Sequence, residues 1–201
     1  MSIPYGDTGR TKQKARTRTA IVAATRKLLE TGTMPTVEQA ADEAGVSRAT
    51  AYRYFPNQSD LLAASHSYID APSLVPPDAG PDAESRLTAV VERITQYVLD
   101  EEGPLRASLR VALERGGGRH EDLPLRQARR LLWVRDALDP LAGEMPDEEL
   151  QRLAMAIAAV IGVETLIWLT DLAGLSKSEA VELMRWTAAS LFKAARPTPG
   201  G

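Results

Sequence analysis

The sequence has no cysteine, and its two histidines, His66 and His120, lie far apart. Without cysteine the chain can form no disulfide framework and offers no thiolate metal ligand and no cysteine nucleophile. The separation of the histidines argues against an imidazole site as well. We therefore expect no metal and no cofactor, and the composition is consistent with a reducing, intracellular setting.

Long hydrophobic runs are also missing. The longest, residues 154–163, is shorter than the roughly 20 residues that a helix needs to cross a bilayer. The N-terminal residues MSIPYGD lack the apolar stretch of a signal peptide. We expect a soluble, unprocessed, cytoplasmic protein with no membrane partner. Its 201 residues, 44% of them hydrophobic, suffice to bury a core in one or two compact units.

Basic residues are outnumbered overall, which gives a net charge of -3, but they are concentrated near the N-terminus. Residues 1–65 contain nine Lys/Arg against six Asp/Glu, whereas the rest of the chain contains 15 against 21. Five of the nine lie within residues 10–18. A basic excess on one segment is typical of a nucleic-acid contact surface, although a charge run alone is more often simply solvated.

Apolar residues recur at helical spacing through the chain, and no segment has the alternation of a strand. This spacing predicts N-terminal helices over residues 11–31, 36–44, 47–55 and 59–70. Residues 71–82 contain four prolines and no helical period. Further helices are predicted around residues 87–98, 105–114, 131–141, 147–172 and 176–195. The predicted fold is all-α, a small N-terminal unit followed by a larger helical bundle.

Residues 36–62, TVEQAADEAGVSRATAYRYFPNQSDLL, contain the most specific local signals. Thr36 and Gln39 have the spacing of a capping box at the start of a helix. Gly45 suits the left-handed position that ends this helix, and Ser47 can cap the next one. Two short capped helices joined by a tight turn predict a helix-turn-helix.

The second helix of this motif is expected to expose its polar side, because Ala51 and Phe55 form an inward i, i+4 pair. Its first turn enters the major groove, where Arg48 and Thr50 can contact base edges and Ala49 presents a methyl group. Hydroxyls and a guanidinium further along suit phosphate oxygens. The predicted DNA-binding residues are Thr36, Ser47, Arg48, Ala49, Thr50, Tyr52, Arg53 and Tyr54. Alternatively, the tyrosines are half-buried and the arginines merely solvated.

The run VSRATAYRYFPNQSDLL, preceded by TVEQAADEAG, resembles the DNA-binding signature of the TetR/AcrR family of bacterial transcriptional regulators over residues 20–62. The resemblance implies an all-helical homodimer with three N-terminal helices that bind DNA and a C-terminal domain that dimerises and holds an inducing ligand. The chain departs from the family pattern at Ala51, where many members have leucine, and at Gln58, where many have lysine. The second departure removes one expected phosphate contact.

The domains expected on this basis are a basic arm (1–14), a helix-turn-helix domain (15–70), a proline-rich linker (71–82), a helical ligand-binding and dimerisation domain (83–195) and a tail (196–201). Homodimerisation is predicted through the last two helices. The residues expected at the interface are Ala158, Ala159, Gly162, Val181, Met184, Ala188, Leu191 and Phe192. The alternative is that these residues only close the core of one chain.

Candidate ligand contacts are large or polar residues on otherwise apolar helices, namely Arg110, Trp133, Glu164 and Trp168. Glu164 stands out because a carboxylate among apolar neighbours is costly unless it is paired. It either binds a ligand group, or pairs with an internal arginine, or faces solvent. The three tryptophans of the chain are more often core residues than ligand contacts.

The function predicted from the sequence is a dimeric repressor that binds a palindromic double-stranded DNA operator and is released by an unknown small-molecule inducer. We do not expect an enzyme, because no metal-spaced cluster, nucleophile or pair of acids is visible. One alternative is an all-helical carrier or enzyme without DNA binding, and another is an architectural helical dimer.

Overall fold

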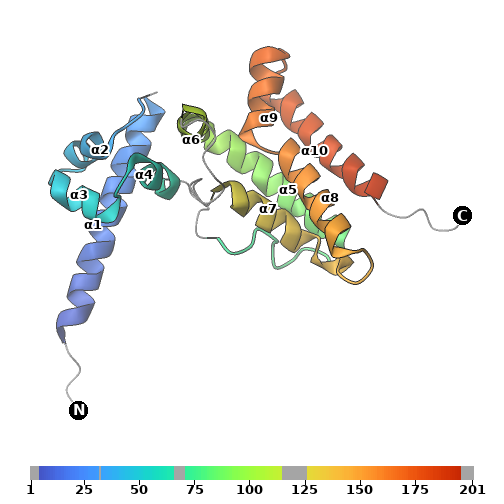
Figure 1. Ribbon diagram of the computed structural model, residues 1–201, viewed down its shortest axis with the longest axis horizontal. Helices are drawn as coiled ribbons and strands as arrows, with labels where there is room; N and C mark the ends of the chain where they lie inside the picture. The colour runs from blue at the N-terminus through green and yellow to red at the C-terminus, as the bar shows by residue number, and fades with distance from the viewer. Residues whose placement is uncertain (1–4, 32, 66–70, 115–125, 196–201) are drawn as a thin grey trace, which may run out of the picture. The chain divides into compact units, whose positions relative to one another are not determined.

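The computed structural model describes residues 5–31, 33–65, 71–114 and 126–195 (Figure 1). These residues form helices and their connections, with an isolated bridge between Ala142 and Met145 but no strand among them. The all-α prediction is confirmed. The chain divides into two compact units, Met1–Ser67 with Arg106–Pro124, and Tyr68–Leu105 with Leu125–Gly201. Both histidines, part of the predicted fourth helix and the predicted tail lie outside the described residues.

The N-terminal part of the first unit contains four helices: α1 (Tyr5–Glu30), α2 (Val37–Glu43), α3 (Arg48–Tyr54) and α4 (Gln58–Ala64). They share a core of Ile21, Val37, Ala40, Ala41, Ala51, Phe55 and Leu61. α1 begins at Tyr5, before the predicted start at residue 11, and helix propensity does not explain the extension, because the added residues YGDTGR include two glycines. Most of the predicted arm is therefore helical.

The fourth helix also starts slightly before its predicted position. Asn57 caps it by accepting a hydrogen bond from the Asp60 backbone N–H at 2.9 Å. Asparagine is among the strongest capping residues, so the helix starts at Gln58 and not at Ser59. A second small core joins α1 and α4 in this unit, where Leu29 and Leu62 pack with the partly buried Ala107.

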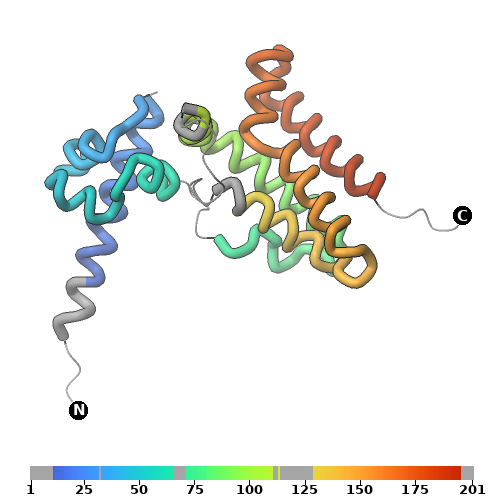
Figure 2. Tube along the Cα trace, in the orientation of Figure 1, coloured from blue at the N-terminus to red at the C-terminus, as the bar shows by residue number. Residues whose placement is uncertain are grey.

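The second unit is a bundle of longer helices, and Figure 2 shows their Cα traces. Its helices are α5 (Ala83–Asp100), the start of α6 (Glu102–Glu114), α7 (Arg126–Ala137), the 3-10 turn η2 (Asp139–Leu141), α8 (Asp147–Val160), α9 (Val163–Ile167), the π-helical turn η3 (Trp168–Leu172) and α10 (Lys177–Ala195). α10 packs against α5 and α8, and α7 packs against α5 and α8. The predicted helix over residues 131–141 ends at Ala137, because Pro140 cannot continue an α-helix.

The prediction of a single helix over residues 147–172 is wrong. The chain bends by 41° between α8 and α9, and Gly162 lies at the break. A Cβ at Gly162 would lie 1.6 Å from Nη1 of Arg130, so only glycine leaves room for that guanidinium. The Thr165 hydroxyl donates to the Ala159 carbonyl at 2.9 Å and so satisfies a group that the break would leave without a helical partner.

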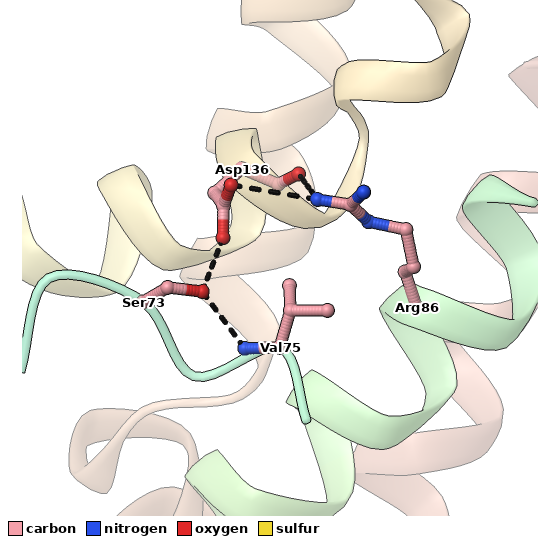
Figure 3. A network of polar contacts seen from close by, with 4 residues as sticks. All are labelled: Ser73, Val75, Arg86 and Asp136. Atoms are coloured by element: carbon pink, nitrogen blue, oxygen red, sulfur yellow. Dashed lines mark hydrogen bonds and ion pairs between the residues drawn. The ribbon is translucent and has the colours of Figure 1, made fainter. Parts of the chain in front are cut away.

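The proline-rich segment, residues 71–82, contains no helix, as predicted. It is nevertheless bound to the second unit, and Figure 3 shows part of the contact. The Ser73 hydroxyl donates to the Asp136 carboxylate and accepts from the Val75 backbone N–H. Arg86 donates to the Asp136 carbonyl at 2.8 Å from the opposite side. The bond from Ser73 joins the segment to α7, and the bond from Arg86 joins α5 to the same residue of α7.

Among the residues that the structure describes, no single helix is both long and apolar enough to span a membrane. The bent pair of α8 with α9 and η3 meets the length and composition requirement when its two halves are taken together.

Candidate nucleic-acid interface

α2 is fixed at both ends by the signals visible in the sequence. The Thr36 hydroxyl accepts from the Gln39 backbone N–H at 3.2 Å, and the Gln39 side chain accepts from the Thr36 N–H at 2.8 Å. Gly45 has a φ of 66°, and the Val46 N–H bonds to the Ala41 carbonyl at 3.0 Å. The predicted capping box and left-handed glycine are confirmed, and together they define the turn between α2 and α3.

α3 is oriented by its cap and by one buried pair. The Ser47 hydroxyl accepts from the Thr50 backbone N–H at 3.2 Å and donates to the Thr50 hydroxyl at 2.9 Å. Ala51 and Phe55 are 0% and 2% exposed in the core of the first unit. The predicted inward face of α3 is confirmed, so the opposite face of the helix remains on the surface.

The side chains predicted to contact DNA are distributed over this outer face. Exposed positions are Thr36, Ser47, Arg48, Ala49, Tyr52 and Arg53, and half-buried positions are Thr50 and Tyr54. Tyr54 packs partly against the core, as the structural alternative foresaw for the tyrosines. The Arg53 guanidinium lies 5.6 Å from the centre of the Tyr54 ring, within the range of a cation–π contact.

Two carboxylates of α2 meet this outer face, which the sequence analysis did not single out. The Tyr52 hydroxyl donates to Oε1 of Glu38, and Nη2 of Arg48 lies 3.8 Å from Oδ2 of Asp42. The available signal was the composition of α2, whose seven residues include three acids and no base. Two predicted DNA contacts are therefore in contact with negative charge in the free protein.

These contacts shift the ionisation of the groups involved. The pKa of Glu38 is lowered chiefly by the hydrogen bond from Tyr52, with smaller contributions from its own backbone N–H, the Thr36 hydroxyl and the charge of Arg48. The same hydrogen bond raises the pKa of Tyr52. Glu38 is therefore held as a carboxylate in the protein.

The basic part of α1 adds further cations to the same unit. Lys12, Lys14, Arg16 and Arg18 are all exposed. The Arg18 guanidinium lies 5.6 Å from the centre of the Phe55 ring at the end of α3. Because Lys14 is one helical turn from Arg18, this side of α1 continues the basic surface beyond α3.

Gln58, the departure from the family pattern at the start of α4, has an internal role. Its side-chain amide donates to the Pro35 carbonyl at 2.9 Å. The bond joins the beginning of α4 to the residue that precedes the cap of α2. A lysine extended toward a phosphate would not make this bond. Gln58 therefore stabilises the position of α4 relative to the start of α2.

The four ligand candidates are not brought together. Trp133 is 4% exposed, and its indole N–H donates to the Ala71 carbonyl at 3.0 Å. Glu164 pairs with Arg130 at 2.9 Å, the second of the three alternatives. Trp168 is 58% exposed on η3. Arg110 is exposed and belongs to the first unit, whereas the other three belong to the second.

A groove of about 270 Å³ lies between α5 and α10. None of the four ligand candidates lines it. Its buried lining includes Leu87, Val91 and Phe192, and its exposed lining includes Glu92, Trp186 and Lys193. Arg185, another lining residue, donates from Nε to the Thr95 hydroxyl at 3.0 Å and so connects the two helices.

No group of three or more His, Cys, Asp or Glu side chains with the spacing of a metal site occurs within the described ranges. The family model for bacterial regulatory proteins of the tetR family matches residues 21–65. This match begins at Ile21 in α1, includes α2 and α3, and ends directly after α4. The search of curated proteins gave no match.

Proposed function

We propose that this chain, whose residues 21–65 match the family model for bacterial regulatory proteins of the tetR family, is a DNA-binding transcriptional regulator and a repressor that binds a palindromic operator as a homodimer. We further propose that a small molecule releases it from DNA. The observation that carries the first proposal is the outer face of α3, which exposes Arg48, Ala49, Tyr52 and Arg53 opposite a buried Ala51–Phe55 pair.

The proposed roles follow from the place of each residue on α3. Arg48 is in the first turn, where a guanidinium can donate two hydrogen bonds to guanine. Ala49 and Thr50 present methyl groups and a hydroxyl to neighbouring bases. Thr36, Arg53 and Tyr54 position the head on phosphates, because they lie at the start of α2 and the end of α3. Ser47 acts as the cap.

Selection of duplexes from a random library by the full chain tests this proposal. We expect an inverted repeat whose half-sites are separated by about 10–10.5 bp, or by a multiple of that spacing, because two identical heads must contact one side of the duplex. If the retained duplexes share no motif and bind no better than the starting pool, the proposal is wrong.

Several residues predicted at the dimer interface lie in the core of one chain, so the dimer proposal rests on other side chains as well. Val181, Met184, Ala188 and Phe192 are buried within the second unit of a single chain. α8 packs against α10, and both helices carry large apolar side chains that stay exposed. These are Met155 on α8 and Leu183 and Trp186 on α10, together with Trp168 and Leu172 on η3. Large exposed apolar side chains on adjacent elements support an interface with a second copy.

Charge introduced into this surface tests the dimer. Trp186→Glu, whose parent side chain is 66% exposed, should produce a monomer in light scattering because it places a charge in the proposed interface. Leu132→Glu is the matched control, since Leu132 is exposed on α7 and lies outside the proposed surface. A dimer that survives Trp186→Glu would contradict the proposal.

For the small molecule, the groove between α5 and α10 is a better candidate than the four predicted residues. Its apolar lining suits a hydrocarbon or aromatic body. Acidic and basic side chains line it in equal number, Glu84 and Glu92 against Arg185 and Lys193, which favours a ligand without net charge. Uncharged aromatic compounds can be screened for release of a fluorescent operator. Ala189→Trp, which fills the groove, should abolish the response to any active compound.

A further inference from the structure

α2 supports the recognition helix, yet it carries three carboxylates and no basic residue. We propose that two of them, Glu38 and Asp42, compete with DNA phosphates for α3 side chains and thereby raise the discrimination of the operator against nonspecific DNA. The inference rests on the proposed contact of α3 with DNA. It assigns a specificity role to two residues that do not themselves contact bases.

The Tyr52 hydroxyl has one proton, and that proton is donated to Glu38. Tyr52 therefore cannot donate to a phosphate oxygen without leaving the carboxylate. The bond lies at the surface, since Tyr52 is 41% exposed. Glu38 thus has two effects. It fixes the position of the Tyr52 ring, and it places a negative charge where a phosphate oxygen would otherwise accept a hydrogen bond from the Tyr52 hydroxyl.

Asp42 acts on Arg48 in the same way. The closest approach between the guanidinium and the carboxylate is 3.8 Å, and both side chains are largely exposed, at 68% and 66%. A surface pair of this kind is weak and exchangeable. Arg48 can leave it for a guanine edge, which offers two directed acceptors, more readily than for a single phosphate oxygen that competes with Asp42 on charge alone.

The effect should differ between the two kinds of DNA complex. Nonspecific binding comes almost entirely from phosphate contacts, so a nearby carboxylate weakens it directly. The operator complex adds base contacts and uses the Tyr52 ring in the position that Glu38 fixes, which offsets part of the repulsion. Glu38 and Asp42 therefore reduce nonspecific affinity more than operator affinity.

Glu43 provides the contrast on the same helix. Its carboxylate pairs with Lys27 of α1 at 2.6 Å, and within the described part of the chain no hydrogen bond or ion pair joins it to α3. Glu43→Gln removes the same charge from α2 as Glu38→Gln does. It separates a general charge effect from the contact with Tyr52 and Arg48.

The test uses the full chain and measures anisotropy with two labelled duplexes, one selected from a random library and one of scrambled sequence. Glu38→Gln keeps an acceptor for Tyr52 but removes the charge, and Asp42→Asn does the same beside Arg48. For each variant, affinity for the scrambled duplex should rise about 3- to 5-fold per bound head. Affinity for the selected duplex should change less than about twofold, and Glu43→Gln should change neither by more than that.

Glu38→Ala separates positioning from charge, because it also removes the acceptor for Tyr52. It should bind the scrambled duplex as Glu38→Gln does but lose affinity for the selected duplex, while thermal unfolding verifies that each variant is folded. Unchanged affinity for the scrambled duplex in Glu38→Gln and Asp42→Asn would overturn the inference. An equal gain on both duplexes, or the same gain in Glu43→Gln, would also overturn it. A parent chain that binds neither duplex would instead refute the proposed function.

Discussion

The two units of this protein use polar side chains in opposite ways. In the first unit, Arg48 and Arg53 stand on the exposed face of a short helix whose other face is buried. In the second unit, Trp133, Glu164 and Arg185 each bind another part of the same unit. Polar side chains in the second unit therefore pair within that unit, whereas the arginines on the outer face of α3 remain at the surface.

Phe55→Ala should have the largest effect on the difference between the two units, because it removes a large side chain from the small core of the first unit only. The loss of stability should be about 3–5 kcal/mol, enough to abolish DNA binding. All three tryptophans of the chain lie in the second unit. The urea transition followed by tryptophan fluorescence should therefore be unchanged, while far-UV circular dichroism shows the loss of α1–α4. A parallel shift of the fluorescence transition would show that the units do not fold independently.

Gly162→Ala tests whether the Arg130–Glu164 pair is structural. The added Cβ would occupy the position of the Arg130 guanidinium, so the pair must separate. We expect a destabilisation of about 1–3 kcal/mol in urea unfolding followed by tryptophan fluorescence.

The control for this substitution is a double-mutant cycle with Arg130→Met. Once the guanidinium is absent, Gly162→Ala should have a smaller further effect, because of the two side chains that the Cβ would meet only Glu164, with Oε2 at 2.1 Å, still has to move. Additive losses would mean that the glycine is required for another reason.

Trp133→Phe sharpens the comparison by removing one hydrogen bond together with part of a buried ring. Loss of the bond to the Ala71 carbonyl should cost about 0.5–1.5 kcal/mol of stability in urea unfolding, and the space left by the smaller ring adds to that loss. Affinity for the selected duplex, and its response to any releasing compound, should be unchanged, because Trp133 does not line the groove. A changed response with unchanged stability would restore Trp133 as a ligand contact.

The smallest expected effect is the pH dependence that Glu38 contributes to the first unit. Because its pKa in the folded chain is below the ordinary value of 4.5, Glu38 stabilises the fold above that value, and this contribution is lost as pH falls through the lowered pKa. The difference in urea stability between the parent and Glu38→Gln, followed by circular dichroism, should therefore shrink on acidification. A difference that stays constant with pH would mean that the carboxylate does not hold Tyr52 in solution.

The sequence predicted the helix-turn-helix well because its signals are local. Capping residues, a left-handed glycine and an i, i+4 apolar pair act within one or two turns, and Thr36, Gly45 and Ser47 behave as their residue types require. The pairing of Glu38 with Tyr52 joins two helices, so spacing rules within a single helix do not predict it. The only signal in the sequence was the presence of three acids and no base on α2.

In the second unit the decisive contacts are distant in sequence. The break at Gly162 depends on Arg130 of another helix, and the environment of Trp133 depends on Ala71 in the proline-rich segment. Helical spacing alone predicted one long helix over residues 147–172, because the period continues across the break. The buried stripe of α10 likewise matched a dimer interface in pattern, although most of it closes the core of one chain.

The central claim, that the outer face of α3 contacts base edges, is tested most directly by the base preference of Arg48→Ala. Affinities of the parent and the variant are measured for the selected duplex and for its single-base substitutions. We predict a loss of about 1–3 kcal/mol on the selected duplex and loss of discrimination at one G·C pair in each half-site, with preferences elsewhere retained. A variant that keeps the affinity and every base preference of the parent would contradict the account.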